Sequence, residues 1–413
     1  MASAPRKAIV IGGSVGGLLI GNMLVRSGWR VDIFERVRDD LASRGAGIAR
    51  HPEMAPIMRA AGVAHDDLSG IEVDGRTAYD RAGNIVAYYP YPQFLSAWSR
   101  VFDPLYSAFP RSQYHLGMEL VGLEQSADTA IARFADGSSV GADLIVGADG
   151  FRSTVRSILA PEIVPRYAGY VAWRGIMPGT ELSETYRADT ITRFAFCFPA
   201  RSQLIAYPLT SLDDSADVGR RRYNFLWYYP VADGADLDDV LTDRSGVTHA
   251  YSIPPPLVRP DHISRVRQNA ASLLPPQFAE VVIRAKQHMV QPIYDVESRN
   301  IAFGRVALIG DAAFVARPHV GIGVLKAGED AFALAKCLAA AGSVPDALVA
   351  YERARLPVGR DAVALGRYLG AFIERGLDGP WCDPDLDLTP EKIIRISARP
   401  LSHVVKRRTY ELG

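Results

Sequence analysis

The amino-acid sequence predicts an α/β protein built from two domains and a C-terminal helical segment. Three observations support this prediction. An apolar run and a glycine-rich turn open the chain, aromatic-rich segments of alternating hydrophobicity fill its middle, and buried-strand patterns with Asp-Gly or Gly-Asp turns recur at residues 144–150 and 306–311. Because 413 residues exceed the limit of roughly 250 to 300 for a single hydrophobic core, more than one domain is expected.

The chain begins with a βαβ pattern. Residues 7–11 form a short apolar strand, residues 18–27 have helical periodicity, and residues 30–34 form a second strand. This order is typical of the first unit of a Rossmann-like domain.

The turn after the first strand resembles a dinucleotide-binding fingerprint. Gly12, Ser14 and Gly17 occupy its three small-residue positions, where the backbone approaches a pyrophosphate at a helix N-terminus. Ser14 replaces the middle glycine, so a purely structural glycine turn is the alternative. Glu35 closes the second strand about 20 residues further on, where a carboxylate accepts hydrogen bonds from the adenosine ribose; an ordinary surface acid is the alternative there.

A second turn follows the buried strand 144–146. It contains Asp149 and Gly150 and precedes a basic helix start at Arg152 and Arg156. The two arginines are one helical turn apart, which would place them near phosphates or near Asp149. A strand-end turn without any ligand is the alternative.

A third turn, Gly310-Asp311, follows the strand 306–309. A carboxylate there can accept hydrogen bonds from a chain of sugar-like hydroxyls, and the next helix can direct the positive end of its dipole at developing negative charge. Between the turn and the helix lies a loop with the turn residues Pro318, Gly321 and Gly323. Each turn alone is weak as a signal, whereas the three in this order are specific.

The middle of the chain predicts a separate β-sheet domain. Residues 170–174 and 203–207 are aromatic-rich alternating segments, and the later strand at 306–309 returns to the first domain. We therefore expect a discontinuous Rossmann-like domain at 1–75, 96–165 and 290–345, a substrate-binding β-sheet domain at 76–95 and 166–289, and a C-terminal helical cap at 346–413.

Composition argues against several functional classes. The 46 basic and 46 acidic residues give no formal net charge, so neither a nucleic-acid nor a membrane partner is expected. The apolar run 8–25 contains five glycines and is better interpreted as strand, turn and helix than as a membrane segment. The three cysteines show no metal-ligand spacing, so we expect no metal site and a cytoplasmic location.

The three turns together resemble the flavoprotein aromatic hydroxylases, the family typified by para-hydroxybenzoate hydroxylase and salicylate hydroxylase. The resemblance spans residues 7–340 and implies a discontinuous, GR2-type FAD-binding domain. The residues that it assigns to FAD, with Asp149 and Gly150 also linked to the nicotinamide, are Gly12, Gly13, Ser14, Val15, Gly16, Gly17, Glu35, Arg36, Arg44, Arg100, Asp149, Gly150, Gly310, Asp311, Pro318, Gly321 and Gly323. For Arg44 and Arg100, a solvated surface arginine is the alternative.

The same resemblance implies the reaction and its partners. The expected enzyme is an NAD(P)H- and O₂-dependent monooxygenase, with NADH or NADPH as co-substrate, that hydroxylates a small aromatic ring through a flavin C4a-hydroperoxide. A homodimer is expected as well. Residues 167–175, 204–208 and 317–319 are most similar to the family branch that hydroxylates 2,6-dihydroxypyridine, which favours a hydroxylated pyridine as substrate. The chain departs from the family at Phe314 and Leu325, where histidine and asparagine are common.

Four residues are candidates for the chemistry on the substrate: His319, Pro318, Tyr207 and Arg174. His319 follows Pro318 in the loop expected beside the flavin and could accept or relay a substrate proton; a packing role is the alternative. Tyr207 and Arg174 lie on expected strands of the second sheet, where Arg174 could attract an anionic substrate. Core packing for Tyr207 and a structural ion pair for Arg174 are the alternatives.

Three other functional classes remain open. A nicotinamide dehydrogenase would not require the second and third turns. A flavin-binding sensor would bind FAD without turnover. A related flavoenzyme would act on a hydroxybenzoate, or would epoxidise or reduce its substrate, and product analysis would distinguish it.

Overall fold

The structure is a computed structural model that describes residues 5–38, 47–64, 70–190, 192–211, 213, 215–374 and 388–404. The helices are α1 (Val15–Arg26), α2 (Met54–Ala60), α3 (Ser99–Ala108), α4 (Thr154–Leu159), α5 (Glu184–Thr190), α6 (Ala235–Leu241), α7 (Pro260–Leu273), α8 (Pro276–Arg284), α9 (Gly323–Ala340), α10 (Val344–Glu374), α11 (Pro390–Ile396) and α12 (Leu401–Val404).

The strands form three sheets. They are β1 (Lys7–Ile11), β2 (Arg30–Glu35), β3 (Gly47–Ala49), β4 (Ile71–Tyr79), β5 (Ile85–Ala97), β6 (Tyr114–Leu116), β7 (Leu120–Gln125), β8 (Ala130–Phe134), β9 (Ser139–Ala142), β10 (Leu144–Gly147), β11 (Arg166–Pro178), β12 (Phe194–Cys197), β13 (Gln203–Leu209), β14 (Arg222–Pro230), β15 (Met289–Glu297), β16 (Ala302–Phe303), β17 (Val306–Leu308) and β18 (Phe314–Val315).

A six-stranded sheet contains the βαβ unit predicted from the sequence. Its order is β16-β17-β10-β1-β2-β6, and every neighbouring pair except β16 with β17 is parallel. Residues 8–11 pair with residues 144–147, so the first and second turns leave the sheet side by side. Since the carboxyl ends of parallel strands meet at one edge, all three predicted turns lie at the same edge of this sheet.

A nine-stranded sheet forms the second half of the molecule. Its order is β18-β15-β11-β14-β13-β12-β4-β5-β3, antiparallel except where β12 pairs with β4. The expected division of the chain into domains placed residues 47–49 and 71–75 in the first domain, as well as residues 290–297. The structure pairs these residues, as β3, the start of β4 and most of β15, within the nine-stranded sheet. The domain boundaries themselves stay a prediction.

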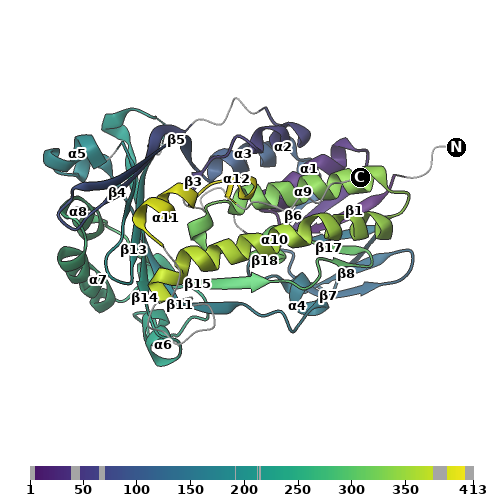
Figure 1. Cartoon of the computed structure of the whole chain (residues 1–413). Coiled ribbons are helices and arrows are strands. Elements are labelled where there is room, and N and C mark those ends of the chain that lie inside the picture. The colour runs from purple at the N-terminus through teal and green to yellow at the C-terminus, as the bar shows by residue number, and fades with distance from the viewer. Residues whose placement is uncertain are drawn as a thin grey trace.

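Helices connect and cover the six-stranded and nine-stranded sheets (Figure 1). Helix α1 packs on α9, and α9 packs on α10. The 31-residue α10 runs from the six-stranded sheet across to the nine-stranded one, where it contacts β11, β14 and β15. One face of the nine-stranded sheet packs under α6, α7 and α8, and the other faces α10, α11 and the cavity described below.

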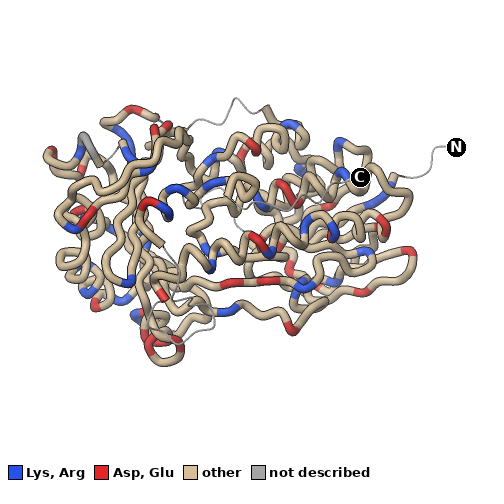
Figure 2. Tube along the Cα trace, viewed as in Figure 1, with Lys and Arg blue, Asp and Glu red and all other residues tan. Residues whose placement is uncertain are grey.

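Positions of Lys and Arg and positions of Asp and Glu are interspersed along the trace in Figure 2. No helix among the described residues is long and apolar enough to span a bilayer.

Candidate active site

The first turn is held in a conformation that needs glycine. Gly12 has φ +103°, and a Cβ there would collide with the backbone carbonyl of Ala148. A Cβ at Gly17 would collide with the carbonyl oxygen of Gly12. The turn therefore fits tightly between β10 and the start of α1, which leaves backbone N–H groups at the helix N-terminus for a ligand.

Glu35 is fixed beside this turn. One carboxylate oxygen accepts a hydrogen bond from the backbone N–H of Gly13 (2.9 Å), and the other accepts from that of Val37 (3.0 Å). A cavity of about 230 Å³ opens next to it at the carboxyl edge of the six-stranded sheet. Its lining includes the predicted residues Gly12, Ser14, Glu35, Arg36, Asp149 and Gly150.

The second turn is held by Asp149 and Arg156. Asp149 accepts hydrogen bonds from the Ser153 hydroxyl (2.5 Å) and from the backbone N–H groups of Thr154 and Val155, so it caps the N-terminus of α4. The buried Arg156 donates to the carbonyl oxygens of Phe151 (2.7 Å) and Ala312 (3.0 Å). Arg156 thereby fastens the second turn to the third, and burial lowers its pKa.

The third turn is fixed from the other side by α9. The backbone N–H of Gly310 donates to Asp330 (3.0 Å), whose other oxygen accepts from Arg355 (2.7 Å). The side chain of Asp311 remains 49% exposed and lines two cavities. Its carboxylate is therefore available to a ligand while its backbone is immobilised.

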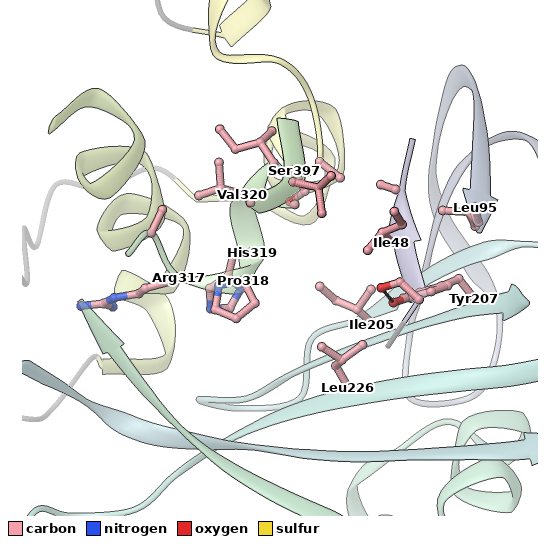
Figure 3. Close-up of a pocket in the computed structure, with 18 of the residues that line it drawn as sticks. Ile48, Leu95, Ile205, Tyr207, Leu226, Arg317, Pro318, His319, Val320 and Ser397 are labelled. Atoms are coloured by element: carbon pink, nitrogen blue, oxygen red, sulfur yellow. Dashed lines mark hydrogen bonds between the residues drawn. The ribbon is translucent and has the colours of Figure 1, made fainter. Parts of the chain in front are cut away.

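The central cavity lies between the third turn and the nine-stranded sheet. It has a volume of about 370 Å³. Figure 3 shows Pro318, His319 and Val320 on one side and Ile48, Ile205, Tyr207 and Leu226 on the other, with Ser397 at the end. Trp98 lines both this cavity and the one beside Glu35, so the two adjoin at its indole. The apolar walls suit a flat ring more than a charged chain.

A buried ion-pair cluster positions the loop that carries His319. Arg317 donates through Nε and Nη2 to the two carboxylate oxygens of Asp295 (3.1 and 3.0 Å) and also pairs with Glu374 near the end of α10. Gly321, at φ +65°, turns the chain after this loop and accepts a hydrogen bond from His51 through its carbonyl oxygen (3.0 Å).

His319 is neutral and is held by Tyr170. Its Nε2 lies 2.9 Å from the Tyr170 hydroxyl, which also accepts from Arg317 (3.4 Å). Burial and the nearby Arg317 charge lower the pKa of His319 to about 3. The Tyr170 hydroxyl therefore joins Arg317 to Nε2, while Nδ1 of His319 has no hydrogen-bond partner among the described residues. The Tyr228 ring lies over the imidazole with centroids 4.0 Å apart.

Tyr207 and Arg174 reach the same cavity from the sheet. The Tyr207 hydroxyl donates to the carbonyl oxygen of Gly47 in β3 (2.8 Å), and burial raises the pKa of Tyr207 to about 12. Arg174 donates through Nη1 to the side-chain carbonyl of Gln291 (2.9 Å) and lines both this cavity and a wider one of about 820 Å³. Arg174 therefore lies between two ligand-sized spaces.

The other predicted site residues have varied positions. Val15 is buried in the core, and Gly16 packs against Ala327 of α9. Arg100 is half-buried on α3, and Arg44 lies outside the described residues. Phe314, where the family often has histidine, is buried against Gly359 of α10, and Leu325 is buried too.

Sequence reasoning missed several residues that line the central cavity. They are Trp98, Tyr228, Lys326, Ser397 and Ala398. Lys326 follows Gly323 by three residues, so its place near the third turn could have been inferred from helical periodicity. The other four residues line the cavity because of long-range packing, which no local sequence pattern predicts.

These residues fit FAD. The glycine cradle, Glu35 and the N-terminus of α1 suit an adenosine diphosphate, while Asp311 and the loop before α9 border the cavity with room for a ring. The cavity beside Glu35 adjoins the central cavity at Trp98, as the binding of one extended dinucleotide requires.

Comparison with known proteins agrees with this interpretation. The profile of the family described as FAD binding domain matches residues 6–217 and 253–365. The 2,6-dihydroxypyridine 3-monooxygenase of Paenarthrobacter nicotinovorans is 32% identical over 380 residues, covering 91% of this chain and 94% of the relative. The 6-hydroxynicotinate 3-monooxygenase of Pseudomonas fluorescens is 28% identical, covering 83% and 85%.

A solved structure is similar throughout. The 2,6-dihydroxypyridine-3-hydroxylase from Arthrobacter nicotinovorans superimposes with a TM-score of 0.83 at 30% identity, covering 94% of this chain and 99% of that one. The fold and the site thus define an FAD-dependent monooxygenase of aromatic rings. The chain belongs to the FAD binding domain family.

Proposed function

We propose that this chain hydroxylates a hydroxylated pyridine, consuming NADH or NADPH and O₂. The observation that carries the proposal is the similarity to the 2,6-dihydroxypyridine enzymes over nearly the full length of both chains. The central cavity supports it, since its volume of about 370 Å³ and its apolar walls suit one small ring beside a flavin.

When bound, FAD supplies the chemistry of hydride acceptance and O₂ activation. The chain's own residues bind, orient and shield the substrate. We place the ring between Pro318 and His319 on one side and Ile205, Tyr207 and Leu226 on the other. The apolar side chains on both sides limit the access of water to the reacting atoms.

We propose that His319 donates a hydrogen bond instead of acting as a base at neutral pH. Its pKa of about 3 keeps the imidazole neutral, and its Nε2 is already engaged by Tyr170. We place the ring proton on Nδ1, with Tyr170 donating to Nε2. The Nδ1–H then has no acceptor among the described residues, so an oxygen or ring nitrogen of the bound molecule would satisfy it. Arg174 supplies positive charge that favours the ionised form of the ring.

We place the nicotinamide in the wider cavity of about 820 Å³. It adjoins the central cavity at Arg174, Asp311 and Pro318, and its walls include Phe151, Arg152, His249, Tyr251 and Tyr294. Aromatic faces and cationic side chains suit a base and a pyrophosphate. A homodimer and a cytoplasmic location are also proposed, on the basis of the family resemblance and the cysteine pattern; sedimentation of the purified protein tests the former.

The test is NAD(P)H oxidation by the FAD-loaded protein against a panel of hydroxypyridines and hydroxybenzoates, with mass analysis of products. We expect one dihydroxypyridine to accelerate oxidation and to gain one oxygen atom. Stimulation by hydroxybenzoates alone would disprove the pyridine substrate. An epoxide or a reduced product would assign a different reaction, and no stimulated turnover would favour a flavin-binding sensor.

A further inference from the structure

Lys326 presents a buried ammonium group at the central cavity. It lies in the first turn of α9, four residues after Ile322, whose carbonyl oxygen accepts the Lys326 backbone N–H (2.7 Å). Its side chain is 2% exposed and lines the cavity together with Asp311 and Gly323. Within the described part of the chain, its Nζ has no hydrogen-bond acceptor.

The neighbouring carboxylates attract this ammonium without satisfying it. Asp311 Oδ1 lies 3.9 Å from Nζ and Asp330 Oδ2 lies 3.8 Å away, both beyond hydrogen-bond range. Asp330 already accepts from Gly310 and Arg355, and Arg355 also pairs with Glu329. The N–H groups of this buried cation therefore lack acceptors, which is unfavourable unless a ligand supplies them.

The position of Lys326 adds charge to a helix N-terminus. Helix α9 begins at Gly323 without a side-chain cap, so its first N–H groups point toward the cavity end of the loop with partial positive charge. A lysine in that same turn places a full positive charge beside the partial one. Such an arrangement favours whichever form of a bound molecule carries negative charge.

We propose that Lys326 holds the flavin end of FAD and stabilises the negative charge that FAD gains on reduction. The ammonium N–H groups then donate to flavin oxygen or nitrogen atoms, and the charge raises the reduction potential of the bound cofactor. This inference rests on FAD binding and not on the pyridine substrate, so failure of the substrate panel leaves it intact.

The experiment is a spectroscopic measurement of the flavin reduction potential in wild type, Lys326→Met, Lys326→Gln and Lys326→Arg, all loaded with FAD. We expect the Met and Gln variants to have more negative potentials, by about 30 mV for each tenfold loss in relative stability of the reduced form. The Arg variant should remain close to wild type. Lys336→Met, on the same helix but far from the cavity lining, is the matched control and should change nothing.

The FAD dissociation constant separates hydrogen bonding from charge. Gln keeps an N–H donor, so Lys326→Gln should bind FAD more tightly than Lys326→Met while sharing its lowered potential. If Lys326→Met does not retain FAD, the proposal is tested by comparing the reduction potentials of Lys326→Gln and Lys326→Arg. Potentials equal to wild type in the Gln variant would overturn the proposal, and so would a change confined to substrate affinity, which would assign Lys326 to the substrate instead.

Discussion

At the scale of single residues, Gly12 in the first turn and Gly16 at the start of α1 have different roles. Gly12 combines φ +103° with direct backbone contact to Ala148, whereas a Cβ at Gly16 would lie 3.5 Å from Ala327 Cβ, an ordinary contact. We expect Gly12→Ala to strain the turn by roughly 1–3 kcal/mol or more and to weaken FAD binding at least tenfold. Gly16→Ala should bind FAD nearly as wild type does. Fluorescence titration of the apoproteins measures both, and equal affinities would show that the turn does not contact the cofactor.

The neutral His319 has a consequence for stability below neutral pH. Its pKa falls from 6.5 to about 3 on folding, so between these values the unfolded chain binds a proton that the folded chain does not. Stability therefore decreases as pH falls through this window, at about 1.4 kcal/mol per pH unit for one proton. Above pH 6.5 the effect disappears.

Urea unfolding at several pH values between 4 and 7 tests this sign. The His319→Gln variant should show a shallower loss of unfolding free energy with acid than wild type, whatever its absolute stability. His403→Gln, at a side chain that is 44% exposed, serves as control and should keep the wild-type slope. A slope unchanged by His319→Gln would mean that the imidazole is protonated in the folded protein.

At the scale of elements, Arg156 connects two turns that are far apart in sequence. Its guanidinium joins Phe151, after β10, to Ala312, after β17. Hydrogen bonds involving a charged group contribute about 1.5–3 kcal/mol each. We expect Arg156→Leu to weaken FAD binding by at least tenfold, because the second and third turns lose their common anchor.

Arg152 offers the comparison for this experiment. It lies in the same turn but is exposed, with its guanidinium 5.8 Å from the Tyr251 ring centroid. Arg152→Leu should leave FAD affinity close to wild type and should instead raise the KM for NAD(P)H, given the proposed nicotinamide cavity. Circular dichroism of both variants checks that the sheets remain folded. Equal losses of FAD affinity would show that charge near the turn matters more than the link between turns.

The elements that could be predicted from the sequence are those whose motifs consist of contiguous residues. The strand, turn and helix at residues 7–26 are contiguous, and so are the turns at 149–150 and 310–311, so each motif carries its own evidence. The residues that complete the cavity are contributed by distant segments. β3 pairs with β5 almost 50 residues later, and Ser397 and Ala398 reach the cavity from the last described segment. Their positions follow from tertiary packing, which no local pattern encodes.

At the scale of the whole molecule, the segment between α11 and α12 forms part of the wall of the central cavity through Ser397 and Ala398. Ala398 lies against Gly321 of the loop before α9, and both line the cavity. The segment is fastened to the nine-stranded sheet by the fully buried Arg76 of β4, which donates to the carbonyl oxygens of Ala398 (2.7 Å) and Ile394 (3.2 Å). Gln93 of β5 also donates to the carbonyl oxygen of Ala398 (3.1 Å), so side chains of two neighbouring strands hold this segment beside the site.

Loss of this anchor should admit water without removing any group that touches the substrate. We expect Arg76→Met to oxidise NAD(P)H at a rate within a few-fold of wild type but to release a larger share of the reducing equivalents as H₂O₂, because a loosened wall no longer excludes water. The measurement is the ratio of H₂O₂ to hydroxylated product per NAD(P)H consumed. Arg395→Met, at an exposed position on α11, is the control and should keep the wild-type ratio. If Arg76→Met stays fully coupled, water exclusion depends on the walls from β13, β14 and the His319 loop alone, and the C-terminal segment serves stability only.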